Sequence, residues 1–169
     1  MTGAGEVTVR PARTTDIRAI RSFIDQYSTD GRLLSKATVT LFEDVQEFLV
    51  AEADGEVVGC GAVHVMWEDL AEVRTLAVDP ARVGHGIGSL LLRALMDRAR
   101  ELGVKRVFCL TFRVRFFEAH GFVEIEDTPV DAGVYAQLLQ SYDEGVAEFL
   151  GLERVKPNTL GNHRMLATL

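Results

Sequence analysis

Three kinds of segment are missing from this sequence of 169 residues, and each absence removes a class of protein. No apolar run approaches the roughly 20 residues that a membrane-spanning helix needs, so no membrane association is expected. Residues 1–6 contain neither the basic stretch nor the apolar stretch of a secretory signal peptide, so we expect a cytoplasmic protein. No stretch of low complexity interrupts the chain, and 47% of its residues are hydrophobic, which is typical of a globular domain.

Positive charge and cysteine are also scarce. The formal net charge of −7 argues against a general nucleic-acid binder, because such a protein normally carries a basic stripe. A small anionic ligand remains compatible with this charge, since its binding site is local. Cys60 and Cys109 both lie in apolar, strand-like segments, so we expect buried free thiols in a reducing compartment. No metal site is expected.

Apolar periodicity and turn residues predict one domain, residues 1–169, with an α+β (mixed α/β) fold. Asp54-Gly55 between two apolar runs is a strong hairpin signal, Gly103 is suited to end a helix, and Thr14 or Thr15 to begin one. Strands are expected at 7–10, 48–53, 57–67, 72–78, 106–111 and 122–125, with 164–169 as an edge strand. Helices are expected around 17–27 and 41–48 and at 88–102, 113–120 and 131–150.

The most specific pattern is EVRTLAVDPARVGHGIGSLLL, residues 72–92. An apolar strand stops at Asp79-Pro80, a turn with Gly84, Gly86 and Gly88 follows, and a Leu-rich helix begins at once. Unpaired N–H groups at a helix N-terminus favour negative charge, and glycine lets the main chain approach a ligand closely. The segment therefore predicts a diphosphate site.

Three alternatives compete with this interpretation. A dinucleotide-binding turn would show Gly-x-Gly-x-x-Gly and open a parallel sheet, whereas this loop has Gly-x-Gly-x-Gly after an antiparallel meander. A nucleoside-triphosphate loop would continue with Gly-Lys-Ser or Gly-Lys-Thr, which is absent. A glycine-rich turn without any ligand is weakened by the helix that starts directly from the loop.

From about residue 48 to residue 125, the sequence resembles the GNAT superfamily of acetyl-CoA-dependent N-acetyltransferases. LAVDP at the strand end, the glycine loop and RFFEAHGF occur in the order of that family. The resemblance implies a central, mostly antiparallel twisted sheet flanked by helices, with acetyl-CoA as co-substrate. It implies that the strand end pairs with the pantetheine amides and that the N–H groups of 83–89 hold the pyrophosphate.

The residues expected to bind acetyl-CoA are Leu76, Ala77, Val78, Arg82, Val83, Gly84, His85, Gly86, Ile87, Gly88, Ser89 and Phe117. Val83 occupies a position where the family usually has Arg or Gln, so Arg82 and His85 are the side chains that we expect to assist the main chain. Phe117 occupies the position of a Tyr that protonates the departing thiolate in many members. A phenylalanine cannot donate that proton, so we expect departure as thiolate or protonation by water.

GEVVGCGAVHV, LTFRVRFFEAHGF and LGNHRML resemble the acetyltransferase domain of the N-acetylglutamate synthase branch, in a short stand-alone form. The resemblance implies transfer of acetyl to the α-amino group of L-glutamate, the first step of arginine biosynthesis. Another acceptor, such as L-glutamine, a small amine or a protein N-terminus, and a non-catalytic acyl-CoA sensor remain alternatives. A homodimer is compatible with the apolar residues of 131–169.

An ammonium group must lose a proton before its nitrogen attacks a thioester, so a nearby carboxylate or imidazole is needed as base. Glu72 at the start of the central strand is the first candidate, with a solvated strand-end carboxylate as an equally weighted alternative. His64 on the neighbouring strand is the second candidate, although a lone His among apolar residues is more often a core residue.

The two carboxylates of glutamate call for arginine, whose planar fork binds a carboxylate through two parallel hydrogen bonds. Arg74 interrupts an apolar strand and, if its neighbours alternate, shares a face with Glu72 and Leu76. Arg164 in LGNHRML is the next candidate. Surface ion pairing is at least as good an explanation for the remaining two candidates, Arg113 and Lys156.

Overall fold

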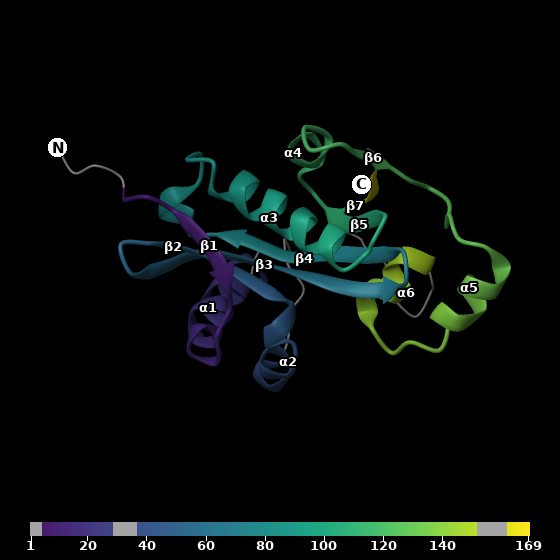
Figure 1. Ribbon diagram of the computed structural model, residues 1–169, viewed down its shortest axis with the longest axis horizontal. Coiled ribbons are helices and arrows are strands. Elements are labelled where there is room, and N and C mark those ends of the chain that lie inside the picture. Colours follow the sequence, from purple (N-terminus) through teal and green to yellow (C-terminus); the bar gives the residue numbers. More distant parts are fainter. Residues whose placement is uncertain (1–4, 29–36, 152–161) are drawn as a thin grey trace. The chain divides into compact units, whose positions relative to one another are not determined.

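The computed structural model describes residues 5–28, 37–151 and 162–169 and contains a seven-stranded sheet of order β1-β2-β3-β4-β5-β7-β6 (Figure 1). The pairs β1–β2, β2–β3, β5–β7 and β6–β7 are antiparallel, and β4–β5 is parallel. The strands are β1 (Thr8–Pro11), β2 (Phe48–Ala53), β3 (Glu56–Trp67), β4 (Leu70–Val78), β5 (Arg106–Thr111), β6 (Phe122–Glu124) and β7 (His163–Thr168). The helices are α1 (Ile17–Ser28), α2 (Thr38–Glu43), α3 (Ile87–Glu101), α4 (Val114–Glu118), α5 (Ala132–Leu138) and α6 (Glu144–Leu150). This arrangement confirms the predicted mixed fold with helices around a sheet.

The chain divides into two compact units. Unit 1 contains Met1–Val63 and Val73–Arg98, and unit 2 contains His64–Glu72 and Ala99–Leu169. The boundary cuts β3 and β4, so each of these strands contributes a segment to both units. Organisation as one domain remains a prediction.

Two apolar clusters hold unit 1 together, one on each face of its strands. Residues of α1 and α2 pack against Phe48 and Val50 of β2, whereas Ile87 and Leu91 of α3 pack with Ala51 and neighbouring residues. Figure 1 shows α1 and α2 on one side of these strands and α3 on the other. The predicted hairpin is confirmed, because Asp54 (φ 52°) and Gly55 (φ 78°) both adopt the positive φ that a type I′ turn requires.

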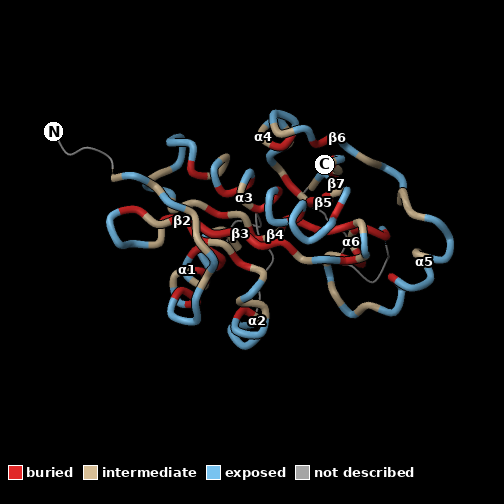
Figure 2. The backbone as a smooth tube through the Cα atoms, viewed as in Figure 1, coloured by how far each residue is buried: buried red, intermediate tan, exposed pale blue. Residues whose placement is uncertain are grey.

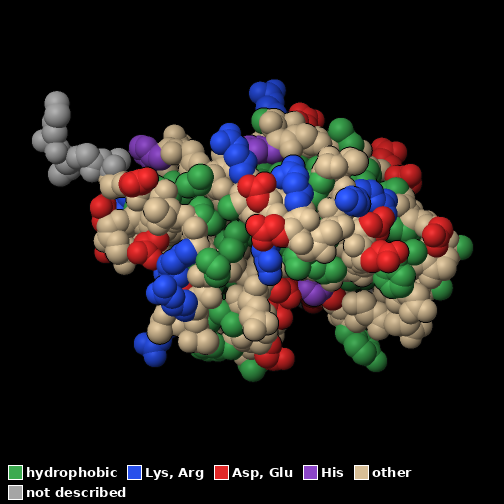
Figure 3. All heavy atoms as spheres, viewed as in Figure 1, with side chains coloured by type: hydrophobic (Ala, Val, Ile, Leu, Met, Phe, Trp, Pro, Cys, Tyr) green, Lys and Arg blue, Asp and Glu red, His purple; other side chains and the backbone are tan. Residues whose placement is uncertain are grey.

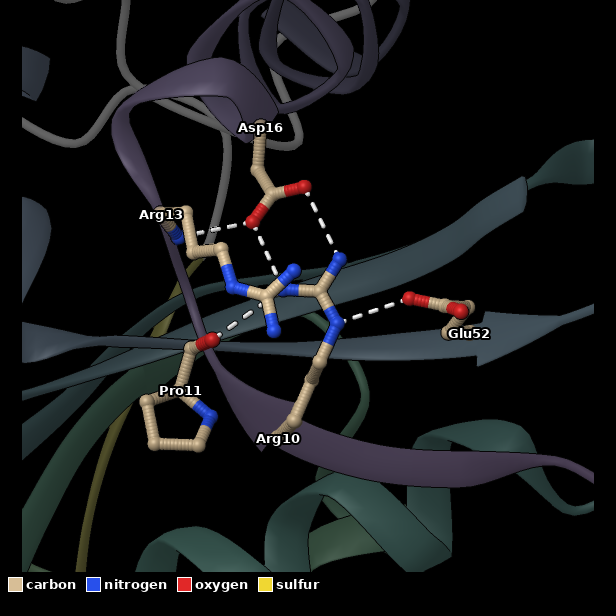
Figure 4. A network of polar contacts seen from close by, with 5 residues as sticks. All are labelled: Arg10, Pro11, Arg13, Asp16 and Glu52. Atoms are coloured by element: carbon tan, nitrogen blue, oxygen red, sulfur yellow. Dashed lines mark hydrogen bonds and ion pairs between the residues drawn. The ribbon is translucent and has the colours of Figure 1, made fainter. Parts of the chain in front are cut away.

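A charged network ties the first strand of unit 1 to the start of α1 (Figure 4). The guanidinium of Arg10 donates to Asp16 at 2.8 and 3.0 Å and to Glu52 at 2.7 Å, and the Asp16 carboxylate also accepts the N–H of Arg13 at 2.7 Å. The hydrogen bond from Arg10 lowers the pKa of Asp16, a carboxyl that is 6% exposed. The network therefore explains why a charged residue is buried at this turn.

The core of unit 2 is centred on two aromatic rings. Phe108 of β5 and Phe149 of α6 meet edge to face with ring centroids 5.2 Å apart. Leu70, Val146 and Leu150 belong to the same buried cluster. Figure 2 shows the buried backbone along the strands and along one side of each longer helix. This packing places α6 beside β5 and the first residues of β4.

Four secondary-structure predictions were wrong in part. Thr14 and Thr15 lie inside a 3₁₀ turn (Thr14–Asp16), and it is Asp16 that receives the N–H of Arg13. The predicted helix around 41–48 ends at Glu43, and Phe48 begins β2. The predicted helix 131–150 is two helices, since the Asp143 side chain accepts the Val146 N–H and starts α6 afresh. Finally, β7 is an interior strand because β6 pairs with its outer side.

In the part of the chain that the structure describes, no helix is both long enough and apolar enough to cross a membrane. In the view of Figure 3, basic and acidic side chains lie among one another on the surface.

Candidate functional site

The glycine loop of unit 1 connects β4 to α3 through a short 3₁₀ turn, Pro80–Arg82. The Asp79 carboxylate starts this turn by accepting the Ala81 N–H at 3.0 Å. Gly84 (φ 89°) and Gly86 (φ 80°) both adopt left-handed conformations, and a Cβ at either position would meet no atom within 4 Å. These glycines are therefore required by the backbone conformation and leave open space above the main chain.

The first turn of α3 leaves main-chain donors for a ligand. The first hydrogen bond into the helix runs from the Leu90 N–H to the Gly86 carbonyl at 3.1 Å. The N–H groups of Ile87, Gly88 and Ser89 precede that bond, and the positive end of the helix dipole adds to their attraction for anions. Arg82 is half-buried and His85 is exposed beside them, while Val83 is 52% exposed. The loop thus presents backbone donors together with two basic side chains.

Thr75 gives β4 an irregular backbone just before the loop. It is a β-branched residue with φ 56°, a conformation that is rare outside glycine. Beyond Thr75 the strand alternates normally, since Leu76 packs with the α3-side cluster and Ala77 packs with the α1-side cluster.

Arg74 is half-buried, and the left-handed Thr75 lies between it and Leu76. The common face of Glu72, Arg74 and Leu76 stays a prediction.

Unit 2 brings two carboxyl side chains onto neighbouring elements. Glu72 is 6% exposed and pairs in register with Phe108, whose ring contacts Phe149. Glu148 precedes Phe149 on α6, and its pKa is raised by burial and then by the negative charge of Glu72. Burial and the same Glu72 charge raise the pKa of Cys109 well above its usual range, so this thiol stays neutral. The first candidate base is therefore buried, and its charge acts on both Glu148 and Cys109.

His64 lies near the N-terminus of α6. Its Nε2 is 3.7 Å from Oδ1 of Asp143, while Oδ2 of the same carboxylate accepts the Val146 N–H at 3.0 Å. The pairing links the second candidate base to the residue that caps α6.

The Arg164 guanidinium donates most of its hydrogen bonds to main-chain carbonyls. It donates to the carbonyls of Glu148 at 3.1 Å, Glu126 at 3.2 Å and Asp127 at 3.1 Å, and to that of Phe149. Both carbonyls of α6 lie in its last turn, where the Glu148 carbonyl also accepts the N–H of Gly151 at 3.1 Å. Four of the five N–H groups of the guanidinium are thereby engaged, so Arg164 caps α6 in addition to any contact with an acceptor.

The remaining candidate residues are dispersed. Arg113 is exposed, and its guanidinium lies 5.0 Å from the centroid of the Phe116 ring. Phe117 is buried within an aromatic group, edge to face with Phe116 and Phe122 at 5.1 Å each. Lys156 lies outside the described residues. The binding roles assigned to these residues remain predictions.

Sequence reasoning missed Glu148 because its local pattern is that of a polar position between the apolar residues of a helix. The one sequence feature that could have indicated Glu148 was its position directly before Phe149, an apolar residue of the same helical repeat. Within the described ranges, no group of three or more His, Cys, Asp or Glu side chains is arranged to hold a metal ion.

Comparison with known proteins identifies this arrangement. A family model described as "Acetyltransferase (GNAT) family" matches residues 16–122. An amino-acid acetyltransferase of Mycobacterium tuberculosis is 57% identical over 165 residues, which cover 95% of this chain and 94% of that protein. The crystal structure of Rv2747 from Mycobacterium tuberculosis, in complex with CoA and NLQ, superposes with a TM-score of 0.92 at 56% identity and covers 96% of this chain and 99% of that chain.

A more distant structure is that of N-acetylglutamate synthase from Neisseria gonorrhoeae, complexed with coenzyme A and N-acetyl-glutamate. Its TM-score is 0.78 at 25% identity. The match covers 97% of this chain but 35% of the synthase.

Proposed function

Because the chain belongs to the GNAT acetyltransferase family, we propose that it is an amino-acid N-acetyltransferase acting on L-glutamate. The α-amino nitrogen of glutamate forms the new N–C bond, the C–S bond of acetyl-CoA breaks, and N-acetylglutamate and coenzyme A leave. The chemistry that acetyl-CoA supplies is its acetyl thioester.

The glycine loop is the observation that carries this proposal. Main-chain N–H groups at the start of α3 and the open space above Gly84 and Gly86 fit the diphosphate of coenzyme A. Leu76, Ala77 and Val78 at the end of β4 are proposed to pair with the pantetheine amides, and Phe117 to contact the cofactor. Arg82 and His85 are the side chains proposed to assist the main chain at the loop.

Glu72 is proposed as the base that takes the proton from the α-ammonium group of glutamate. Its buried position in register with Phe108 keeps bulk water away from the carboxylate that would take the proton. His64, paired with Asp143, is the alternative base.

Arg74 is proposed to bind a carboxylate of glutamate, since it is a half-buried arginine in the apolar strand β4 and its planar fork suits a carboxylate. For Arg164, the four carbonyl contacts favour a positioning role for α6, and among the described residues one N–H has no protein acceptor and could reach the substrate. Arg113 and Lys156 stay candidates for the second carboxylate.

The product suggests a place in metabolism. N-acetylglutamate formation is the first step of arginine biosynthesis, and we propose this role together with a cytoplasmic location. A homodimer is the oligomer we propose to test by light scattering.

An acceptor screen tests the proposal. Release of coenzyme A would be measured with acetyl-CoA and each amino acid, with spermidine, and with a peptide bearing a free N-terminus. We expect turnover with glutamate and much slower release with lysine, spermidine and peptide. Equal rates with all acceptors would contradict an amino-acid enzyme, and a higher kcat/KM with glutamine would reassign the acceptor.

The acceptor site is tested by an Arg74→Ala variant, which should raise the KM for glutamate far more than the KM for acetyl-CoA. The opposite pattern would remove Arg74 from the acceptor site.

The base is tested separately by the pH dependence of kcat. Profiles of kcat against pH for Glu72→Gln and His64→Gln identify which residue accepts the proton, because loss of the base is felt most where the amine is protonated.

A further inference from the structure

Tyr27, near the end of α1, reaches the end of β4. Its hydroxyl donates to the Val78 carbonyl at 2.5 Å. From the sequence, Tyr27 is one apolar position of a helical repeat, and its ring does pack against the α1-side cluster of unit 1. In addition to this packing, the hydroxyl of Tyr27 is hydrogen-bonded to the main chain of Val78, the last residue of β4.

The direction of this hydrogen bond identifies the edge of β4 that Tyr27 approaches. The next residue, Asp79, donates its N–H to the Val58 carbonyl of β3 at 2.8 Å. Alternate residues of a strand direct their main-chain groups to opposite edges, so the N–H and carbonyl of Val78 face away from β3. Tyr27 therefore holds the main chain of β4 at the edge that faces away from β3.

That edge includes the residues proposed to pair with pantetheine. Hydrogen bonds from Tyr27 to Val78 and from Asp79 to Val58 both act at the end of this strand. The bond from Asp79 joins it to β3 through the main chain, whereas the bond to Val78 comes from a helix side chain. Thr75, three residues earlier, has a left-handed backbone that is unfavourable for a threonine, so a hydrogen bond beyond it helps to hold the end of the strand in place.

We propose that Tyr27 is a positioning residue for acetyl-CoA, which holds the Val78 peptide group in the orientation that the pantetheine arm requires. This inference rests on the proposed function, because it concerns the coenzyme A edge of the same strand. Tyr27 does not act on the reacting atoms in this role. Its effect is on the affinity for acetyl-CoA and not on proton transfer.

The test is a Tyr27→Phe variant, which keeps the packed ring and removes the hydroxyl alone. Isothermal titration of acetyl-CoA should show a dissociation constant about fivefold higher than that of the wild type, as expected for one lost hydrogen bond. The KM for acetyl-CoA should rise in parallel, while kcat and the KM for glutamate stay within about twofold. Thermal unfolding of the same sample shows whether the fold is intact.

Tyr135→Phe is the matched control, since Tyr135 is half-buried in α5 of unit 2 and packs in a different core cluster. Its acetyl-CoA affinity should equal that of the wild type. Unchanged affinity in Tyr27→Phe, with or without a lower melting temperature, would overturn the inference, as would an equal loss in Tyr135→Phe. A wild type that binds acetyl-CoA but acetylates no amino acid would instead contradict the proposed function.

Discussion

The glycine loop of unit 1 and the charged residues of unit 2 are built in different ways. In the loop, consecutive residues present main-chain N–H groups, and the absence of a side chain at Gly84 and Gly86 leaves the main chain open to a ligand. In unit 2, Glu72, Glu148 and Arg164 come from separate elements and depend on packing to meet. A binding site made of main chain tolerates side-chain changes around it, whereas one made of side chains fails with a single substitution.

The difference also separates the two substrates in the proposed reaction. Acetyl-CoA, the acetyl donor, would be held largely by the glycine loop, whose residues are adjacent in the sequence. The acceptor and its proton would be handled by side chains whose charges influence one another, as the raised pKa of Glu148 indicates. Substitutions in the two regions should therefore change different kinetic constants.

The largest effect is expected from Glu72→Gln. Removal of a general base should lower kcat about a thousandfold, with the deepest loss at low pH, where the amine is mostly protonated. Coenzyme A release measured across the neutral and alkaline range checks this, with exposed Glu118 of α4 changed to Gln as the control. A loss of the same size at every pH would shift the role of base to His64 or water.

Asp16→Asn should lower stability without affecting either substrate. Breaking a buried ion pair costs about 3 kcal/mol at neutral pH. The pKa of Asp16 is lowered in the folded state, so this stabilisation is complete above the ordinary value of 3.8 and disappears as pH falls through the lower folded value. Urea unfolding at neutral and acidic pH measures the difference.

The control for this change is Asp25→Asn in the same unit, because Asp25 forms an exposed pair with Arg21 one helical turn away. Its loss should stay below about 0.5 kcal/mol. A stability difference for Asp16→Asn that persists unchanged in acid would show that Arg10 does not act through the charge of Asp16.

Arg164→Lys should cost about 2 kcal/mol, because a single ammonium cannot reach all four carbonyls that the guanidinium contacts. Trp67, the one tryptophan of the sequence, packs against the core of unit 2, so its fluorescence reports unfolding there. Arg115→Lys, at an exposed position of α4, is the control. A higher KM for glutamate with full stability would instead make Arg164 an acceptor ligand.

Gly86→Ala should give the smallest change. A left-handed conformation costs a residue with a Cβ about 1 kcal/mol. The empty loop should therefore leave this conformation in the variant, and restoring it on binding raises the KM for acetyl-CoA about fivefold. Gly121→Ala is the matched control, since Gly121 has φ 88° and equally open surroundings but lies in unit 2. An equal rise in KM for both variants would mean that the loop has no special role in binding the donor.

Much of the fold and of the donor loop could be predicted because the signals are local. The Asp54-Gly55 turn, the end of α3 at Gly103 and strand β5 follow from neighbouring residues, and the structure has them where the sequence indicates. The glycine spacing and the helix after it likewise predict the loop. A backbone with positive φ and a helix start require only residues that are adjacent in the chain.

The acceptor side could be predicted only as a set of residue types. Its arrangement depends on contacts between distant segments: Arg164 meets the end of α6, and Glu148 meets the charge of Glu72. The left-handed Thr75 has no local signal, because a threonine adopts that conformation only when its surroundings impose it.

Sequence alone was therefore sufficient for the loop, whose shape follows from glycine and a helix N-terminus. Tertiary structure decided the position of β7 inside the sheet, the capping role of Arg164 and the anchor between Tyr27 and Val78. The physical reason is the range of the interactions. A turn is stabilised within a few residues, whereas a hydrogen bond between residues 51 positions apart exists only after the chain has folded.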